Sequence, residues 1–228
     1  AKAVASAPAD GHLLLMGHVN SNAIAPSLVD KPSYDPVKDF TPVTYVGFVP
    51  NVLTISSATP ARNVQELVAL ARSRPNGISF ASPGVGSTNH LAGELMKMET
   101  GAPMVHVPYK GSGPAIIDLL GGQVDMNFDA MSSIVGHLKS GRMRALAVTT
   151  PKRDPDLPEV PTMRELGYQA FEMTNWYGVM APAGTPPAIV TRLHEQLRAI
   201  LQMPDVAARL DELGVRREVM SPAQFADF

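Results

Sequence analysis

The chain has 228 residues, of which 45% are hydrophobic and 18% charged, and this length suits one large domain or two small ones. The formal net charge is -2 and no basic run is present, which argues against nucleic-acid binding. Cysteine is absent, which excludes disulfides and thiolate chemistry, and no apolar run reaches membrane-spanning length.

The chain begins with the predicted tail of a helix, residues 1–7, and we interpret its start without a signal peptide as a processed or trimmed end. The apolar run Leu13–Met16 predicts a buried parallel strand. Asn20 and Ser21 follow this strand directly. Polar loops past the carboxyl end of a parallel strand are where open α/β sheets bind ligands, so both are candidate contacts, although turn and cap roles fit them as well.

Two strands and a helix come next. Val43–Val46 and Val52–Ile55 are short apolar runs with β-branched residues, and they predict two separate strands. Asn63 opens the following helix, with Glu66 three residues later as in a capping box. The turn at residues 75–77 ends this helix.

The stretch from residue 78 to 90 predicts a strand, a glycine-rich turn and a helix start. Gly84 and Gly86 permit backbone angles that other residues avoid, and the three N-cap residue types Ser87, Thr88 and Asn89 follow. Free N–H groups and the helix dipole attract negative charge to such a terminus. We therefore expect a site for a small anion, preferably a carboxylate, although an ordinary strand–turn–helix connection also explains the turn.

This turn does not match the known phosphate-binding sequences. A P-loop needs a Lys after its second glycine, and none follows here. A dinucleotide turn needs a third glycine where Asn89 stands. His90 lies in the first turn of the predicted helix, where it either faces the ligand or packs at the helix start.

Three further polar or aromatic residues lie beside predicted loops. Asp129 follows an alternating, half-buried strand pattern and could act as a general base, bind a ligand or cap the next helix. Tyr109 and Trp176 could wall a small-ligand cleft, with buried packing as the default role. Strands alternate with helices throughout, which predicts an α/β fold with mainly parallel sheets.

The sequence lacks the constellations that catalysis needs. The six histidines show no metal-binding spacing, so we expect no metal site. Gly111-Ser112-Gly113 lacks the spacing of a hydrolase nucleophile elbow, and no paired acidic residues support a base role. The pattern therefore favours binding over catalysis, without a cofactor.

Seven motifs in one order resemble the periplasmic solute-binding receptors of tripartite tricarboxylate transporters, also called the Bug family. They are Ser82–Glu94, His106–Ala115, Gly121–Asp125, Arg144–Thr149, Leu157–Thr162, Trp176–Gly178 and Ala181–Pro186. The resemblance covers essentially the whole chain, and so many motifs in one order make a specific match.

The resemblance implies a two-lobed Venus-flytrap binding protein of type II with an α/β sheet in each lobe. Residues 1–55 and 176–228 would form the first lobe, and residues 56–175 the second. In this family, two strand–helix loops hold the ligand's carboxylate, one from each lobe and often with ordered waters. The second-lobe loop maps onto residues 82–88, in agreement with the anion site expected from the backbone.

The chain departs from the family pattern at both ends. The family's first strand, its glycine-rich loop and the helix after it have no counterpart, and the C-terminal helix is cut short after Phe228. We therefore expect weak ligand binding and an exposed sheet surface.

The resemblance implies a monomeric periplasmic receptor that captures a small carboxylate and presents it to membrane transporter subunits. No Arg lies in the expected binding loops, so we expect no bidentate Arg clamp. Candidate ligands are di- and tricarboxylates, acidic amino acids and aromatic acids such as nicotinate. The alternatives are a module that signals to a membrane sensor kinase, and an enzyme with Asp129 as its base. The expected ligand-binding residues are Asn20, Ser21, Ser82, Gly84, Val85, Gly86, Ser87, Thr88, His90, Tyr109, Asp129 and Trp176.

Overall fold

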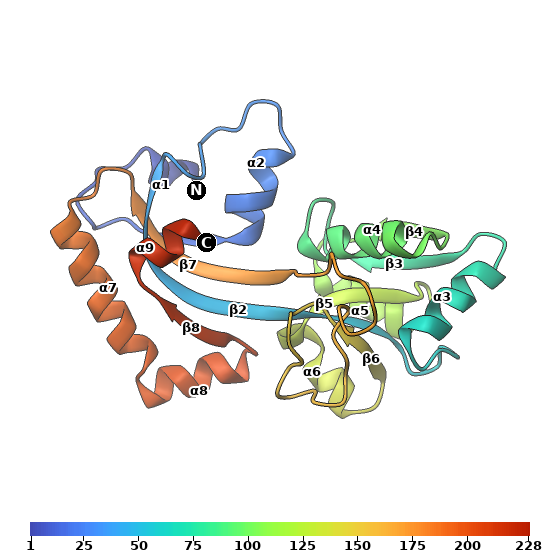
Figure 1. The fold of residues 1–228 in the computed structure, drawn as a ribbon. Coiled ribbons are helices and arrows are strands. Elements are labelled where there is room, and N and C mark those ends of the chain that lie inside the picture. Colours follow the sequence, from blue (N-terminus) through green and yellow to red (C-terminus); the bar gives the residue numbers. More distant parts are fainter. The chain divides into compact units, whose positions relative to one another are not determined.

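The computed structural model describes residues 1–228, which divide into two compact units (Figure 1). The first unit contains residues 1–49 and 175–228, and the second contains residues 50–174. The sequence analysis ends the first segment of the first lobe at residue 55, whereas in the structure the second unit already begins at residue 50. None of the helices combines the length and the apolar composition that a membrane-spanning segment needs.

One long strand, β2 (Phe40–Ser56), contributes residues to both units. The prediction of two separate strands in this region is therefore wrong. Gly47 lets the strand continue, because its backbone has a φ of +142° at a point where the register against the C-terminal strand shifts. A Cβ at Gly47 would lie 2.3 Å from the carbonyl oxygen of Arg216, so only glycine fits there.

The first unit combines four strands with short and long helices. Its elements besides the first part of β2 are α1 (Lys2–Ala5), β1 (Leu15–His18), the π-helix η1 (Asn20–Ile24), α2 (Ala25–Ser27), β7 (Thr174–Pro182), α7 (Pro187–Leu201), α8 (Pro204–Glu212), β8 (Arg216–Met220) and α9 (Pro222–Asp227). The strand order is β1–β7–β2–β8, in which β1 is antiparallel to β7 and β8 is antiparallel to β2.

Strand β1 corrects two predictions. It is antiparallel, and it lies at the end of the strand order instead of inside a parallel sheet. Within β1, Met16 is 58% exposed whereas its neighbour Gly17 is buried, so one face of the strand is open. Leu13, which is 46% exposed, precedes the strand. The apolar run Leu13–Met16 is typical of a strand that other elements cover on both faces. Whether a strand is covered depends on its neighbours in the fold, which the run itself does not contain.

The second unit carries the predicted glycine-rich turns. Its elements besides the second part of β2 are α3 (Val64–Ser73), β3 (Ile78–Ser82), α4 (Thr88–Thr100), β4 (Met104–Pro108), α5 (Ser112–Leu120), β5 (Met126–Ala130), α6 (Met131–Lys139) and β6 (Met143–Val148). The predicted cap of α3 is confirmed, because the side chain of Asn63 accepts the N–H of Glu66 at 2.8 Å.

The sheet of the second unit has the order β6–β2–β5–β3–β4. β3 is parallel to both β4 and β5, whereas β2 is antiparallel to β5 and β6. The predicted parallel sheet therefore describes this unit except for β2, and it does not describe the first unit. Each of the parallel strands β3, β4 and β5 is followed along the chain by a helix, as Figure 1 shows for β3 and α4. The starts of α4, α5 and α6 therefore gather at one edge of the sheet.

Candidate functional site

The loop of residues 82–88 lies at this edge, between β3 and α4. Gly84 and Gly86 have φ angles of +153° and +80°, which residues with a side chain rarely adopt. Ser87 caps α4, because its Oγ accepts the N–H of His90 at 3.2 Å. The prediction of a glycine-rich turn followed by a capped helix is confirmed.

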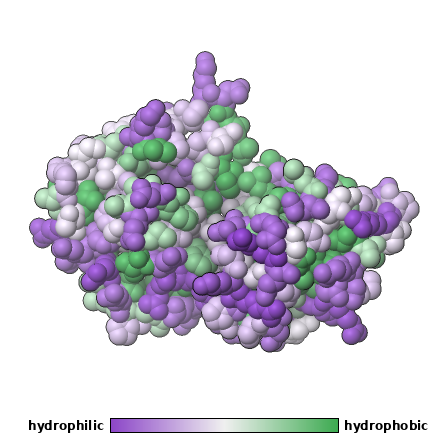
Figure 2. Space-filling view, in the orientation of Figure 1, coloured by the Kyte–Doolittle hydropathy of each residue, from purple (hydrophilic) through white to green (hydrophobic).

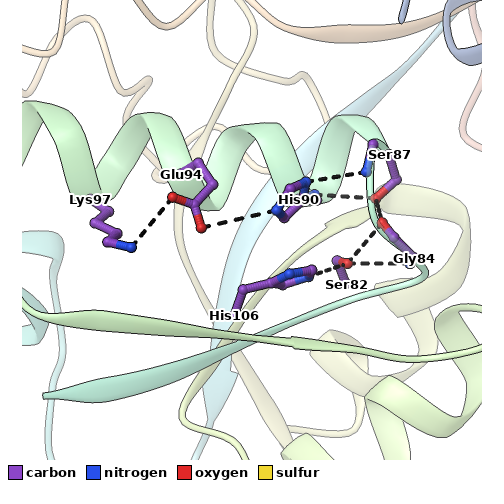
Figure 3. A network of polar contacts seen from close by, with 8 residues as sticks. Ser82, Gly84, Ser87, His90, Glu94, Lys97 and His106 are labelled. Atoms are coloured by element: carbon purple, nitrogen blue, oxygen red, sulfur yellow. Dashed lines mark hydrogen bonds and ion pairs between the residues drawn. The ribbon is translucent and has the colours of Figure 1, made fainter. Parts of the chain in front are cut away.

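Hydrogen bonds hold this loop in one shape (Figure 3). The Oγ of Ser87 donates to the carbonyl oxygen of Gly84 at 2.7 Å, and the N–H of Gly84 donates to the Oγ of Ser82 at 3.2 Å. The N–H of Tyr109 donates to the carbonyl oxygen of Ser82 at 2.9 Å, which joins the loop to the end of β4. Because the loop is already ordered, an anion that binds it has little ordering entropy to offset.

The loop offers backbone donors more than hydroxyl groups. Ser82 and Thr88 are 0% and 1% exposed, so their side chains point into the unit. Val85 is 73% exposed, and its N–H makes no hydrogen bond within the chain. The N–H of Gly86 donates to Nδ1 of His90 at 3.2 Å. An anion at this loop would therefore meet the free N–H of Val85 and the histidine-bound N–H of Gly86.

Two histidine rings pack together beside the loop, His90 from α4 and His106 from β4. His90 and His106 have ring centroids 4.0 Å apart, and the ring of His106 stacks on Phe80 at 5.0 Å. Nε2 of His106 shares a hydrogen bond of 2.7 Å with the Oγ of Ser82. Burial lowers the pKa of His106, and the neighbouring charge of His90 lowers it further. The pair thus connects both halves of the loop to the core.

His106 is a site residue that the sequence analysis missed. The signal that could have found it is the parallel pairing of β3 with β4, which places His106 opposite Phe80 in the register. Phe80 lies two residues before the start of the loop at the end of β3. A residue paired with Phe80 on β4 therefore lies close to the loop.

Asp129 lies on β5 at the same edge but is 1% exposed. Its Oδ1 accepts the hydroxyl of Ser112 at 2.9 Å and the N–H of Ala130 at 2.8 Å, and its Oδ2 accepts the amide of Asn127 at 3.0 Å. Burial raises the pKa of Asp129, while these three hydrogen bonds act in the opposite direction. The carboxylate therefore joins the end of β5 to the start of α5, and its bonds are made within the chain.

Tyr109 follows β4, but its hydroxyl points along α5. It donates to Oδ2 of Asp118 at 2.7 Å, and burial together with Asp118 raises the pKa of Tyr109 to about 12. The hydroxyl is therefore engaged with α5, while the backbone N–H of Tyr109 holds the loop.

Three predicted residues belong to the first unit. Asn20 and Ser21 lie in η1 directly after β1, where the hydroxyl of Ser21 donates to the carbonyl oxygen of His18 at 3.1 Å. The Oδ1 of Asn20 is buried and has no hydrogen-bond partner. Trp176 packs edge-on against Phe225 at 5.8 Å.

Trp176 also lines a cavity of about 270 Å³ in this unit. Its lining is mainly apolar and includes Phe40, Met180 and Phe228. Trp176 therefore packs against Phe225 and lines a cavity, both within the first unit.

The charged residues show no metal-binding arrangement: no group of three His, Asp or Glu side chains lies close enough to hold an ion.

On the face drawn in Figure 2, hydrophilic residues cover most of the surface and hydrophobic residues form separate patches between them. The site chemistry that the chain offers is thus hydrogen bonding from backbone N–H groups with two imidazoles beside them.

Comparison with known proteins identifies the family. The whole chain, residues 1–228, matches the family described as the tripartite tricarboxylate transporter family receptor. Protein BugT of Bordetella pertussis (strain Tohama I) is 37% identical over 227 residues, which cover 99% of this chain and 70% of BugT.

Two solved structures are also similar over 99% of this chain. A protein of R. palustris with adipate has a TM-score of 0.88 at 37% identity, with 76% of it covered. MatC from Rhodopseudomonas palustris with bound malate has a TM-score of 0.82 at 33% identity, with 78% of it covered. The matches confirm the predicted two-lobed α/β fold and the prediction of a receptor instead of an enzyme. The chain therefore belongs to the tripartite tricarboxylate transporter receptor family.

Proposed function

We propose that this protein is a monomeric periplasmic receptor that captures a small carboxylate and delivers it to a tripartite tricarboxylate-type transporter. Family membership supports the receptor role. The adipate and malate held by two similar proteins support a carboxylate as the ligand class.

The observation that carries the proposal is the backbone geometry of residues 82–88. The free N–H of Val85 lies in an ordered, glycine-containing loop at the start of α4. A helix of 13 residues places the positive end of its dipole there, which favours a negative ligand. No arginine lies in this loop, so recognition would rest on N–H groups instead of an ion pair.

The other predicted residues have separate parts in the proposal. Asn20 and Ser21 remain candidates for ligand contacts from the first unit, and the unpartnered Oδ1 of Asn20 is an acceptor for a ligand hydroxyl or ammonium group. Trp176 remains a candidate for contact with the apolar part of a ligand. We assign Asp129 and Tyr109 to positioning the start of α5 and the loop, because their polar groups are bonded within the chain.

Thermal melting with a panel of carboxylic acids, and with their amides as controls, tests the proposed function. A ligand at a hundredfold excess over its Kd stabilises the folded state by about 2.7 kcal/mol. For a chain of this length, we expect the matching acid to raise the Tm by roughly 5–10 °C. The panel covers adipate, malate, citrate, glutamate and nicotinate up to millimolar concentrations. A shift with an acid and none with its amide supports the proposal, and no shift with any acid counts against it.

A matched pair of glycine variants locates the binding at the loop. Gly86 and Gly101 have φ angles of +80° and +61° at opposite ends of α4, so alanine costs about 1–2 kcal/mol of stability at each. We expect Gly86→Ala to abolish most of the ligand-induced shift and Gly101→Ala to keep it. Equal loss of the shift in both variants would contradict a role for the loop.

A further inference from the structure

We propose that His90 competes with the bound carboxylate for the N–H of Gly86, so that protonation of His90 releases this N–H and makes capture tighter as the pH falls. The inference deepens the proposed function and rests on it, because it concerns the same loop. It gives the receptor a pH-dependent affinity that the backbone site alone would lack.

The geometry of the Gly86 hydrogen bond carries the first step. The N–H of Gly86 donates to Nδ1 of His90 at 3.2 Å. Nδ1 accepts a hydrogen bond only when it carries no proton, so this contact requires the neutral ring with its proton on Nε2. Protonation of Nδ1 would point its N–H at the N–H of Gly86 and break this hydrogen bond. The N–H of Gly86 would then be free to donate to a ligand at the loop.

The ring that faces His90 from β4 restricts the pair to one proton. The centroids of His90 and His106 are 4.0 Å apart, so positive charges on both rings would repel each other. His106 is engaged with the Oγ of Ser82 at 2.7 Å, and burial lowers its pKa. A proton on His106 is therefore disfavoured.

The charged groups on α4 favour a proton on His90. Oε1 of Glu94 lies 4.0 Å from Nε2 of His90 and stabilises the imidazolium. Lys97 opposes it, but its Nζ lies 3.5 Å from Oε2 of Glu94, which offsets its charge. Phe80, which stacks on His90 at 6.5 Å, carries no charge. Together with His106, these residues are the groups that face His90 from its own helix and from the two neighbouring strands.

The direction of the pH effect follows from the two protonation states. The neutral ring occupies the N–H of Gly86, whereas the charged ring frees it and adds a positive charge beside the loop. Carboxylate binding therefore favours the protonated state and takes up a proton. Couplings of this kind change affinity by about 5–150-fold, and we expect roughly five- to tenfold tighter binding at about pH 6 than at about pH 8. An aliphatic carboxylate is largely ionised at both values.

Isothermal calorimetry with adipate, and with malate in a second series, measures this dependence. The wild-type protein is titrated at both pH values in two buffers of different ionisation enthalpy, which reports proton uptake directly. We expect tighter binding and proton uptake at the lower pH. Binding of equal strength at both pH values, without proton uptake, would overturn the inference and leave the proposed function intact.

Two histidine variants separate a proton switch from a packing role. His90→Gln keeps an acceptor for the N–H of Gly86 at every pH, so we expect this variant to lose the pH dependence of binding. His106→Gln keeps a polar group beside Ser82 and should retain the dependence. Loss of the dependence in His106→Gln but not in His90→Gln would contradict the assignment of the proton.

Amide NMR of the ligand-free protein completes the test. We expect the Gly86 amide signal to move with the same midpoint as the ring signals of His90. A Gly86 amide signal that stays unchanged while His90 is titrated would overturn the inference whatever the binding data show. Failure of both acids to bind at either pH would instead count against the proposed function.

Discussion

Replacing Gly93 with alanine is expected to destabilise the second unit by about 2–3 kcal/mol. Gly93 lies inside α4 and faces Phe80, and a Cβ there would come within 2.2, 2.4 and 2.8 Å of three atoms of the phenyl ring. Phe80 is 0% exposed, so its ring has no free space into which to move. The added methyl group must therefore push α4 away from β3 or displace the ring.

Gly136 provides the matched control. It also lies inside a helix, α6, but a Cβ there would have no heavy atom within 4 Å. We expect Gly136→Ala to be neutral or to stabilise the protein by up to about 1 kcal/mol, because alanine has the higher helix propensity. Urea denaturation of both variants measures the difference. Equal stability of Gly93→Ala and Gly136→Ala would show that α4 and β3 are not packed as described.

Replacing Asp129 with alanine is expected to cost about 2–4 kcal/mol of stability, because three donors lose their acceptor inside the protein. These donors are the hydroxyl of Ser112, the N–H of Ala130 and the amide of Asn127. Asp129→Asn should remain within about 1 kcal/mol of the wild type near neutral pH. The Oδ1 of Asn127 has no partner, so this amide can turn over and accept a hydrogen bond from the new amide.

The two Asp129 variants also differ from the wild type in their pH dependence. Burial raises the pKa of Asp129 in the folded state above its unfolded value of about 3.9. The stability that protonation provides is therefore fully present below about pH 3.9 and is lost as the pH rises through the folded-state pKa. We expect the wild type to gain stability relative to Asp129→Asn on acidification, as measured by urea denaturation across the acidic range. A gain on alkalinisation would contradict the raised pKa.

Local rules predicted the backbone of the candidate loop. The glycines at positions 84 and 86, followed by Ser87, determine a turn and a capped helix through nearest-neighbour effects. The predicted cap of α3 by Asn63 and Glu66 is confirmed for the same reason. Such features depend on residues only a few positions apart, so a sequence pattern contains them.

Contacts between distant residues account for what the sequence did not reveal. The bond between Ser82 and His106 spans 24 residues, and the bond between Ser112 and Asp129 spans 17. Both depend on strand register. The hydroxyl of Tyr109 points to Asp118 instead of toward the loop. The residue type alone does not determine which partner the hydroxyl takes.

The enzyme alternative can be set aside on two grounds. The family is one of receptors, and the carboxylate of Asp129 is buried and bonded on both oxygens within the chain. A general base must reach the proton that it abstracts, and this geometry holds Asp129 on α5 and β5. The residue contributes to the site by fixing the edge of the sheet that carries the loop.

The measurement that tests the central claim most directly is an amide NMR titration of the protein with the acid that raises the Tm. Capture by the loop predicts that the amide signals of Val85 and Gly86 shift downfield and saturate together with the melting response, because these N–H groups donate to the ligand. Signals in α3 and β6 should stay unchanged. Saturable binding that leaves the Val85 and Gly86 amides where they are would contradict the claim that this backbone holds the carboxylate.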